Sequence, residues 1–491
     1  IVLLISSYSI PSAVSKVIAQ KLAKREYRNA HRIFQCAFIY VLVVGSVASL
    51  FVFFGAGLLV QIEAAIPALR VLAPTIFLSG ILGVLRGYFQ AHKSMVQTSV
   101  SQIVEQILNA VFSILMAYLL LQAAGGTESE NGLAYGAAGG AIGTGIGVLA
   151  ALLFMVWLYL VNRPFLKRRI LHDTDHKEES YQEIFKMIIM VVTPFILSTF
   201  IYNANTFINQ TLYQKLMMEL HGLTDAGVAA HTGIVGKAVK VSNIPIALSS
   251  AMASALIPGI SGEYAKKNLK ETRNQVARAV KATMLISIPA AVGMGVLAKP
   301  VMLVLYPQKA SIDLSSSLLM VLSVSVIFYA VSTLSNAVLQ SIGRLNSPVI
   351  NAAIALVLQT AGLAAMIIFL DESYGPYYYA VTIILYAFLM CVLNGAALRK
   401  HLRYKQEIGR TFVRPVLASA VMGAAAFFIY QGIYLLLHSN LVSLFVAVVL
   451  AAAIYFVMIL LLGAVTEDEM KMLPKGYLLV KIARKTRLLR S

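Results

Sequence analysis

Three polar residues, evenly spaced in an otherwise apolar segment, are the strongest chemical signal in this chain. Lys237, Lys240 and Asn243 recur at three-residue intervals within residues 228–260, so they would share one broad face of a helix. Ionisable groups inside a membrane-spanning helix are costly and usually face a cavity or a partner. We predict that both lysines face an aqueous cavity and bind an anion. The alternative is that they extend to water near a helix end.

A second polar face is expected in the first half of the chain. The i, i+3, i+4, i+7 spacing of one helical face links Gln102, Glu105, Gln106 and Asn109. Glu105 is the only acidic residue well inside any predicted span. It could carry a coupling proton, neutralise a lysine or join two helices, so we assign this face a coupling or structural role.

Two more polar stripes are expected in the second half. The first comprises Tyr202, Asn205, Thr206, Asn209 and Tyr213, with Asn203 beside it, and the second comprises Tyr329, Ser332, Asn336 and Gln340. A single stripe often only joins helices, but stripes in both halves predict a hydrated seam. Our candidate substrate-binding residues are Lys237, Lys240, Asn243, Lys16, Arg86, Asn203, Asn205, Asn209 and Gln340. For Lys16, a turn before a basic loop, extension to water is a competing reading.

Signals for enzymatic chemistry are weak. Asp173-Thr174-Asp175 resembles a metal-binding aspartate pair, but it lies in a short charged segment that we interpret as a solvated linker. We find no His/Cys ligand cluster and no glycine-rich phosphate loop. Cys36 and Cys391 both lie in apolar segments, so we expect no disulfide and no metal. The sequence therefore predicts a protein that is not an enzyme and has no cofactor.

Composition places the chain in a membrane. It is 59% hydrophobic and only 12% charged, with a mean hydropathy of +0.79. A bilayer core needs about 20 apolar residues per helix. We expect thirteen spans, at residues 1–20, 33–60, 67–90, 95–121, 134–161, 185–214, 228–260, 278–305, 315–340, 347–370, 376–398, 412–437 and 441–464. Glycines crowd the fifth span, which favours close helix packing there.

Charge predicts the orientation. The formal net charge is +19, and alternate connections hold most of the 40 Lys and Arg residues. By the positive-inside rule these connections, and the C-terminus, are predicted to be cytoplasmic. Anionic lipids are expected partners. Nucleic acid is not, because the basic residues are divided among seven short segments.

A repeated motif predicts the architecture. Ile10-Pro11-Ser12-Ala13 returns as Ile244-Pro245-Ile246-Ala247, and each copy precedes a basic segment. Six spans separate the copies, so the repeat is parallel and a central cleft is expected between two lobes. We predict an all-α polytopic protein with an N-terminal lobe (1–164), a cytoplasmic linker (165–184), a C-terminal lobe (185–405), two additional helices (406–464) and a basic tail (465–491). The repeat also implies one helix and part of the next before Ile1, hence fourteen spans when intact.

Several segments resemble a known family. They are Ile10 to Ala19, Arg86-Gly87-Tyr88-Phe89-Gln90-Ala91-His92-Lys93, Val100 to Gln106 and Ser242-Asn243-Ile244-Pro245. They look like the polysaccharide-transport branch of the MOP exporter superfamily, nearest the stage V sporulation protein B and MurJ-like lipid II flippases. The resemblance covers essentially the whole chain.

The resemblance implies a function. Two six-helix lobes would move an undecaprenyl-pyrophosphate-linked saccharide from the inner to the outer leaflet by alternating access, and the C-terminal pair would help form a groove for the lipid tail. MurJ-type proteins carry cavity arginines partly on a first helix, which would lie before Ile1, and lysines on residues 228–260 would have to do similar work. Transport would use a Na⁺ or H⁺ gradient or the membrane potential. Cell-wall synthesis enzymes are further expected partners. The alternatives are a drug or organic-cation exporter of the same superfamily and a membrane scaffold in cell-wall or spore-wall synthesis.

Overall fold

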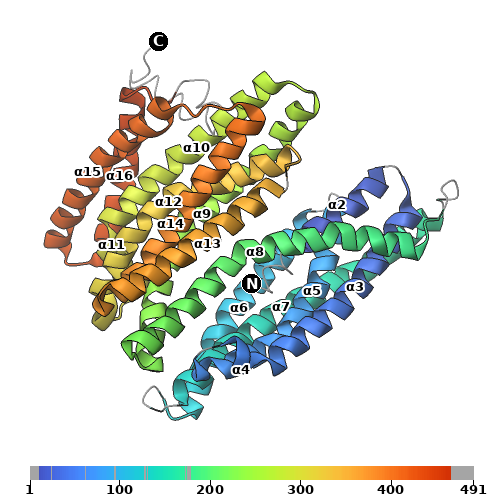
Figure 1. The fold of residues 1–491 in the computed structure, drawn as a ribbon, viewed down its shortest axis with the longest axis horizontal. Coiled ribbons are helices and arrows are strands. Elements are labelled where there is room, and N and C mark those ends of the chain that lie inside the picture. The colour runs from blue at the N-terminus through green and yellow to red at the C-terminus, as the bar shows by residue number, and fades with distance from the viewer. Residues whose placement is uncertain are drawn as a thin grey trace. The chain divides into compact units, whose positions relative to one another are not determined.

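The computed structural model describes residues 10–23, 25–60, 62–92, 95–126, 129, 131–171, 173, 178–344 and 346–465. Helices dominate this part of the chain, which contains no β-strand (Figure 1). The chain divides into two compact units, Ile1–Thr211 and Leu212–Ser491. This division falls inside one long helix, α8, and not in the connection 165–184.

The first unit is built around α5. Its helices are α2 (Ile10–Ala23), α3 (Tyr27–Phe54), α4 (Ala56–Leu59), α5 (Ile66–Ala91), α6 (Met95–Ala123), α7 (Gly132–Leu171) and the first part of α8 (Tyr181–His221). Helices α2, α3 and α7 each pack on α5, and α6 packs mainly on α7. Ile184 and Ile188 of α8 are fully buried in the same core, which is why this end of α8 belongs to the first unit.

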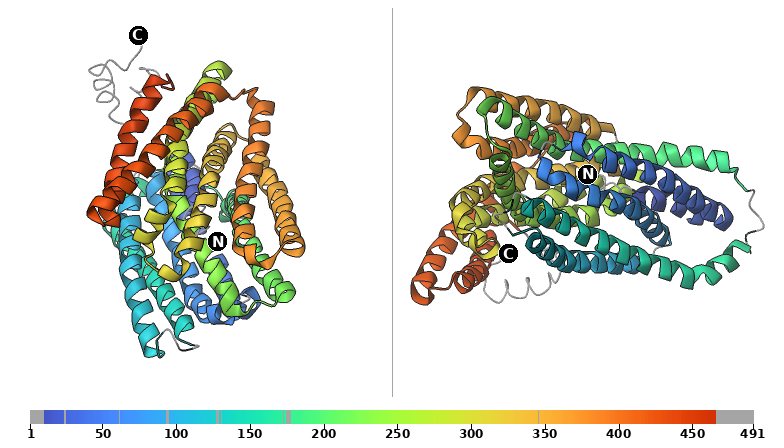
Figure 2. Two further views of the ribbon diagram at one scale, coloured as in Figure 1. Left: turned by 90° about the vertical axis from the view of Figure 1, so that its left-hand side faces the viewer. Right: turned by 90° about the horizontal axis from the view of Figure 1, so that it is seen from below.

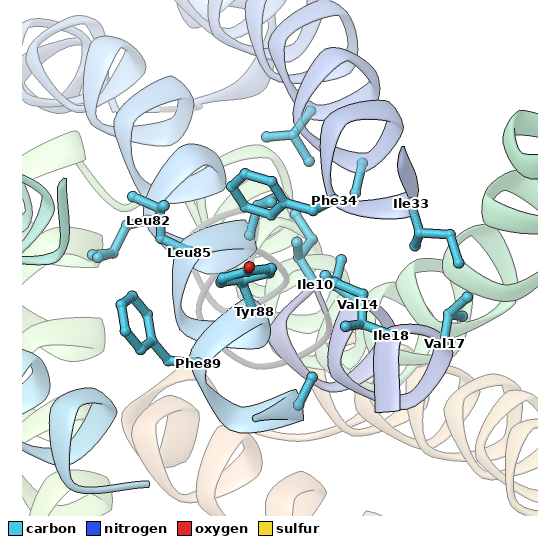
Figure 3. Packing of buried hydrophobic residues seen from close by; sticks show 14 of the residues in the cluster. Ile10, Val14, Val17, Ile18, Ile33, Phe34, Leu82, Leu85, Tyr88 and Phe89 are labelled. Atoms are coloured by element: carbon cyan, nitrogen blue, oxygen red, sulfur yellow. The ribbon is translucent and has the colours of Figure 1, made fainter. Parts of the chain in front are cut away.

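Two of the sequence motifs meet in this core. Val14 and Ile18, from the motif helix α2, pack beside Phe34 of α3 and Tyr88 of α5 (Figure 3). The rings of Phe34 and Tyr88 lie 4.5 Å apart. Gly87 allows α5 to approach α2 closely, since a Cβ there would lie 2.8 Å from the Pro11 carbonyl oxygen. The Arg86-Gly87-Tyr88 segment is therefore shaped by contact with the Ile-Pro motif.

Gly87→Ala should destabilise the folded protein by about 1–3 kcal/mol, because the added methyl group forces two backbones apart. Thermal unfolding of the purified protein in detergent measures the effect. Gly140→Ala is the matched control: it lies within α7, and its Cβ would meet nothing within 4 Å. Equal unfolding temperatures for the two variants would contradict the close approach.

Helices α6 and α7 also pack closely. Cβ atoms added at Gly139, Gly143 and Gly147 would lie 2.3 Å, 2.1 Å and 2.6 Å from backbone atoms of α6. Their i, i+4, i+8 spacing places them on one face of α7. The predicted packing role of the glycine cluster is confirmed at these three positions.

In the described residues, the second unit contains the end of α8, then α9 (Asp225–Ala265) and further α-helices. These are α10 (Leu269–Val296), α11 (Ala298–Leu305), α12 (Ile312–Ser341), α13 (Asn346–Phe369), α14 (Gly375–Leu402), α15 (Arg414–Leu437) and α16 (Asn440–Leu461). Helix α9 packs on α10 and α12, and α14 packs on α12 and α13. Helices α15 and α16 lie side by side (Figure 2). Their anchors are Tyr455 Oη, which donates to the Leu285 carbonyl at 2.9 Å, and Asn440 Nδ2, which donates to the Pro300 carbonyl at 3.1 Å.

The predicted spans coincide with helices. Ten helices in the described residues are long and apolar enough to cross a membrane. The prediction of an all-α polytopic membrane protein is confirmed, while the count of thirteen and the lobe boundaries stay predictions. Two spans were wrong in detail, because residues 33–60 lie in two helices, α3 and α4, and residues 278–305 lie in two helices, α10 and α11. Pro300 explains the second break, since it has no N–H to continue the bonding of α10.

Candidate substrate site

Lys237 is held by uncharged groups. It lies on α9, half-buried, and its Nζ donates to Gln308 Oε1 in the connection between α11 and α12. The same ammonium lies 5.8 Å from the centre of the Tyr306 ring, within the range of a cation–π interaction. Lys237 therefore already has two neutral partners in this structure.

Lys240 and Asn243 differ from Lys237. Both side chains are exposed, and no hydrogen bond or ion pair to either is found among the described residues. They share their helix face with Ile244 and Leu248, which are 65% and 51% exposed. The two predicted lysines thus lie on one face of α9. Of the two, Lys240 is the one whose ammonium has no hydrogen bond or ion pair among the described residues.

An apolar cavity adjoins these lysines. It measures about 830 Å³ and lies between α9, α10, α11, α15 and α16. Val241, Ile244, Pro245 and Leu248 of α9 line one wall, and the walls formed by the other helices include Leu285, Pro289, Met294, Leu305, Met422, Val448, Ala452 and Tyr455. Lys237 precedes Val241, and Lys240 precedes Ile244, by one helical turn each. Helix α9 therefore places cationic groups about one turn from an apolar cavity, an arrangement suited to an anionic headgroup joined to an apolar chain.

Arg86 and Glu105, predicted separately, form one buried pair. Arg86 Nη2 donates to Glu105 Oε2 at 2.7 Å, and Arg86 Nε donates to Ser101 Oγ at 2.8 Å. The side chain of Arg86 is 2% exposed and that of Glu105 is 13% exposed. Arg86 is thus neutralised inside the first unit. The hairpin could have indicated this contact, since Arg86 and Ser101 lie equally far from the turn between α5 and α6.

The other polar residues of the 102–109 face differ in burial and in their contacts. Asn109 Oδ1 accepts hydrogen bonds from Ser113 Oγ at 2.8 Å and from Thr144 Oγ1 of α7 at 3.2 Å. Gln102 is half-buried and Gln106 is exposed. Asn109 joins helices α6 and α7, as the structural reading of this face expected.

The asparagines of α8 bond to each other. Asn209 Nδ2 donates to Asn205 O at 2.7 Å and to Asn205 Oδ1 at 2.6 Å, and both side chains are buried. Tyr213, further along α8 in the second unit, contacts His231 Nδ1 at 3.3 Å through its hydroxyl. The side chains of Asn203 and Lys16 lie outside the described residues.

Gln340 belongs to a local pair on α12. Its Nε2 donates to Asn336 Oδ1 at 3.0 Å, and the contact is exposed. A buried chain of amides nearby escaped the sequence analysis. In it, Asn351 Nδ2 donates to Asn394 Oδ1 at 2.8 Å, and Asn394 Nδ2 donates to the Ser332 carbonyl at 3.4 Å. These bonds join α12, α13 and α14, so the polar residues here connect helices.

The linker segment is anchored to the first unit. Asp173 is 5% exposed, and its Oδ2 accepts from the Arg28 backbone N–H at 3.0 Å. The reading of Asp173 as part of a solvated linker was therefore wrong. The physical reason is that the first turn of α3 has backbone N–H groups without partners, and Asp173 supplies an acceptor from outside the helix. Residues 174–177 lie outside the described residues.

Ion pairs strengthen this anchor. Glu178 pairs with Arg32 and, at 3.3 Å, with Arg28, while Lys21 pairs with Glu179 and, at 3.0 Å, with Glu26. Burial alone lowers the pKa of Lys21, but the hydrogen bonds and charges of the two glutamates outweigh it, so the pKa lies above its ordinary value. Basic residues at the end of α2 and in the first turns of α3 thus bind the chain's own linker.

The chain matches a family model described as "Lipid II flippase MurJ" over residues 20–456. It is 24% identical to the lipid II flippase MurJ of Bacillus subtilis (strain 168), across 92% of this chain and 84% of that protein. It is 22% identical to the stage V sporulation protein B of the same organism, across 96% and 88%. Among solved structures, an inward-facing multidrug resistance MATE family transporter of the MOP superfamily superposes with a TM-score of 0.69 at 17% identity, covering 82% of this chain and 87% of that one. The last likeness concerns the fold alone.

Proposed function

Since the chain belongs to the lipid II flippase MurJ family, we propose that it moves an undecaprenyl-pyrophosphate-linked saccharide from the inner to the outer leaflet of the bacterial plasma membrane. The family, predicted from sequence motifs, consists of membrane transporters rather than catalytic enzymes. Alternating access between two lobes is the proposed route. The C-terminus is proposed to be cytoplasmic, in line with the distribution of basic residues.

The observation that supports this proposal is that α9 places an exposed lysine one turn away from the apolar cavity. Lys240 is exposed and unpaired among the described residues, and one turn later Ile244 lines the apolar cavity. A polyprenyl pyrophosphate has the same two parts, a dianionic headgroup and an apolar chain. The lysines would neutralise the headgroup, and the cavity would hold the first part of the tail.

This arrangement suggests how the energetic barrier is lowered. Moving a bare dianion through lipid is prohibitive, because an unpaired charge loses its hydration. Lysine ammonium groups replace part of that hydration with charge-assisted hydrogen bonds. The tail stays in apolar surroundings throughout. Only the headgroup then needs a polar path, and a gradient or the membrane potential would set the direction.

A drug or organic-cation exporter is less well supported. A cationic cargo needs an available carboxylate inside the membrane, and Glu105 is already paired with Arg86 at 2.7 Å. A scaffold would need neither exposed lysines on a span nor an apolar cavity beside them. The geometry therefore favours an anionic lipid as cargo.

The test is a leaflet-accessibility assay in liposomes that contain the purified protein. Undecaprenyl-pyrophosphate saccharide should become accessible on the opposite face, and a lipophilic cation should not be transported. Applying sodium, proton and potential gradients one at a time identifies the energy source. Transport of the cation alone would replace the proposal with an exporter, and movement of neither compound under any gradient would favour a scaffold.

A further inference from the structure

A tight turn follows α11 at Tyr306-Pro307-Gln308. The Tyr306 N–H donates to the Met302 carbonyl at 2.7 Å, and the Gln308 N–H donates to the Tyr306 carbonyl at 2.8 Å. The second bond closes a three-residue turn around Pro307, whose ring restricts φ to values that suit such a turn. The turn is thus preformed, and both of its flanking side chains meet the ammonium of Lys237.

This turn contacts Lys237 but not Lys240. Lys237 has an amide oxygen and an aromatic ring as partners, while Lys240, three residues later, has no partner among the described residues. Like charges at this spacing on a helix destabilise each other. The contacts with Gln308 and Tyr306 hold the Lys237 ammonium at the turn. Because Tyr306 and Gln308 are uncharged, they hold the ammonium without cancelling its charge.

We propose that the Tyr306-Pro307-Gln308 turn is a positioning device for Lys237. It holds the ammonium until an anionic headgroup binds at Lys240, and Lys237 then exchanges the Gln308 oxygen for a headgroup oxygen. This inference rests on the proposed function for the nature of the anion. The exchange is favourable because a hydrogen bond to a charged acceptor is stronger than one to a neutral amide.

The chemistry of position 308 separates this role from a merely structural one. Gln308→Ala removes the hydrogen-bond acceptor and leaves Lys237 with the Tyr306 ring as its only partner among the described residues. Gln308→Glu converts the acceptor into a charged partner that competes with the headgroup. A structural role predicts that both variants weaken the protein in the same way. The positioning role predicts opposite changes in the accessibility of the Lys237 amine, and slower transport for Gln308→Glu.

Lysine acetylation of the purified full chain, read residue by residue by mass spectrometry, tests the holding step without any lipid. In the wild-type protein Lys240 should react about threefold or more faster than Lys237, given the usual strength of such contacts. Gln308→Ala should raise the rate at Lys237 towards that at Lys240, and Gln308→Glu should lower it below the wild-type rate. Gln431→Ala, at an exposed glutamine of α15, is the control. Equal rates in the wild type, or an unchanged Lys237 rate in Gln308→Ala, would overturn the proposal.

Inorganic pyrophosphate then tests the exchange. It should protect Lys240 in the wild type and protect Lys237 at the same concentrations. Protection of Lys240 with an unchanged rate at Lys237 would contradict the exchange but not the proposed function. Failure to protect Lys240 would contradict the anion site of the proposed function, whatever the turn does.

Discussion

Replacing both Lys237 and Lys240 with glutamine should abolish transport of the lipid-linked saccharide while leaving folding intact. Lys240→Gln alone should lower the rate roughly tenfold or more, because a hydrogen bond to a charged group contributes about 1.5–3 kcal/mol. The loss is expected at Lys240 first, since this is the lysine without a partner among the described residues. The liposome assay measures the rates, and thermal unfolding checks the fold.

A matched control is available on a neighbouring helix. Lys215 of α8 is 54% exposed and lies 3.7 Å from Glu219, in an ordinary surface pair of small energetic value. Lys215→Gln should transport at the wild-type rate. If the folded Lys237→Gln/Lys240→Gln protein transports at the wild-type rate, the anion site does not lie on α9.

Glu105→Ala should destabilise the protein by about 3–5 kcal/mol, because it leaves the guanidinium of Arg86 buried without a counter-charge. Arg86 is 2% exposed, so water cannot replace the missing partner. The double variant Arg86→Met/Glu105→Leu should recover most of the loss, since both charges are removed together. Unfolding free energies for the wild type, Arg86→Met, Glu105→Leu and the double variant Arg86→Met/Glu105→Leu form a complete cycle and give the coupling energy.

A further variant, Glu105→Gln, tests the alternative role of Glu105. If the pair is structural, Glu105→Gln should lower stability and transport together. If Glu105 carries a coupling proton, Glu105→Gln should keep wild-type stability and lose transport. A coupling energy near zero would mean that the contact between Arg86 and Glu105 contributes nothing to folding.

The sequence predicted the helices well because long apolar segments have few alternatives in a membrane. The break between α10 and α11 was missed, although Pro300 signals it, because the apolar run continues through it. The contact of Gly87 with Pro11 could not be predicted from spacing. It depends on how α2 and α5 cross, which is set by the packing of Val14, Phe34 and Tyr88.

The candidate site stays a prediction. The spacing of Lys237 and Lys240 placed both on one face of α9, but the partners of Lys237 lie 69 and 71 residues away in sequence, on a turn whose direction no local pattern reveals. Several other candidates bond within their own unit. Arg86 pairs with Glu105, Asn209 bonds to Asn205, and Gln340 bonds to Asn336. A polar stripe in a sequence does not distinguish a side chain that waits for a ligand from one that joins two helices.

One lipid should bind with its headgroup at the lysines and the first part of its tail in the apolar cavity. Photocrosslinking can determine whether it does. The probe is a polyprenyl pyrophosphate with a diazirine in the first part of its tail. Crosslinks should concentrate on peptides of α10 and α16 that line the cavity, and they should weaken in Lys240→Gln.

Two neighbouring valines of α16 supply the control. Val448 lines the cavity and Val449 does not, although they are 49% and 52% exposed. Val448→Trp should block crosslinking and Val449→Trp should leave it at the wild-type level. Crosslinks spread evenly over lipid-facing helices, and unchanged by Val448→Trp or Lys240→Gln, would contradict the proposed site.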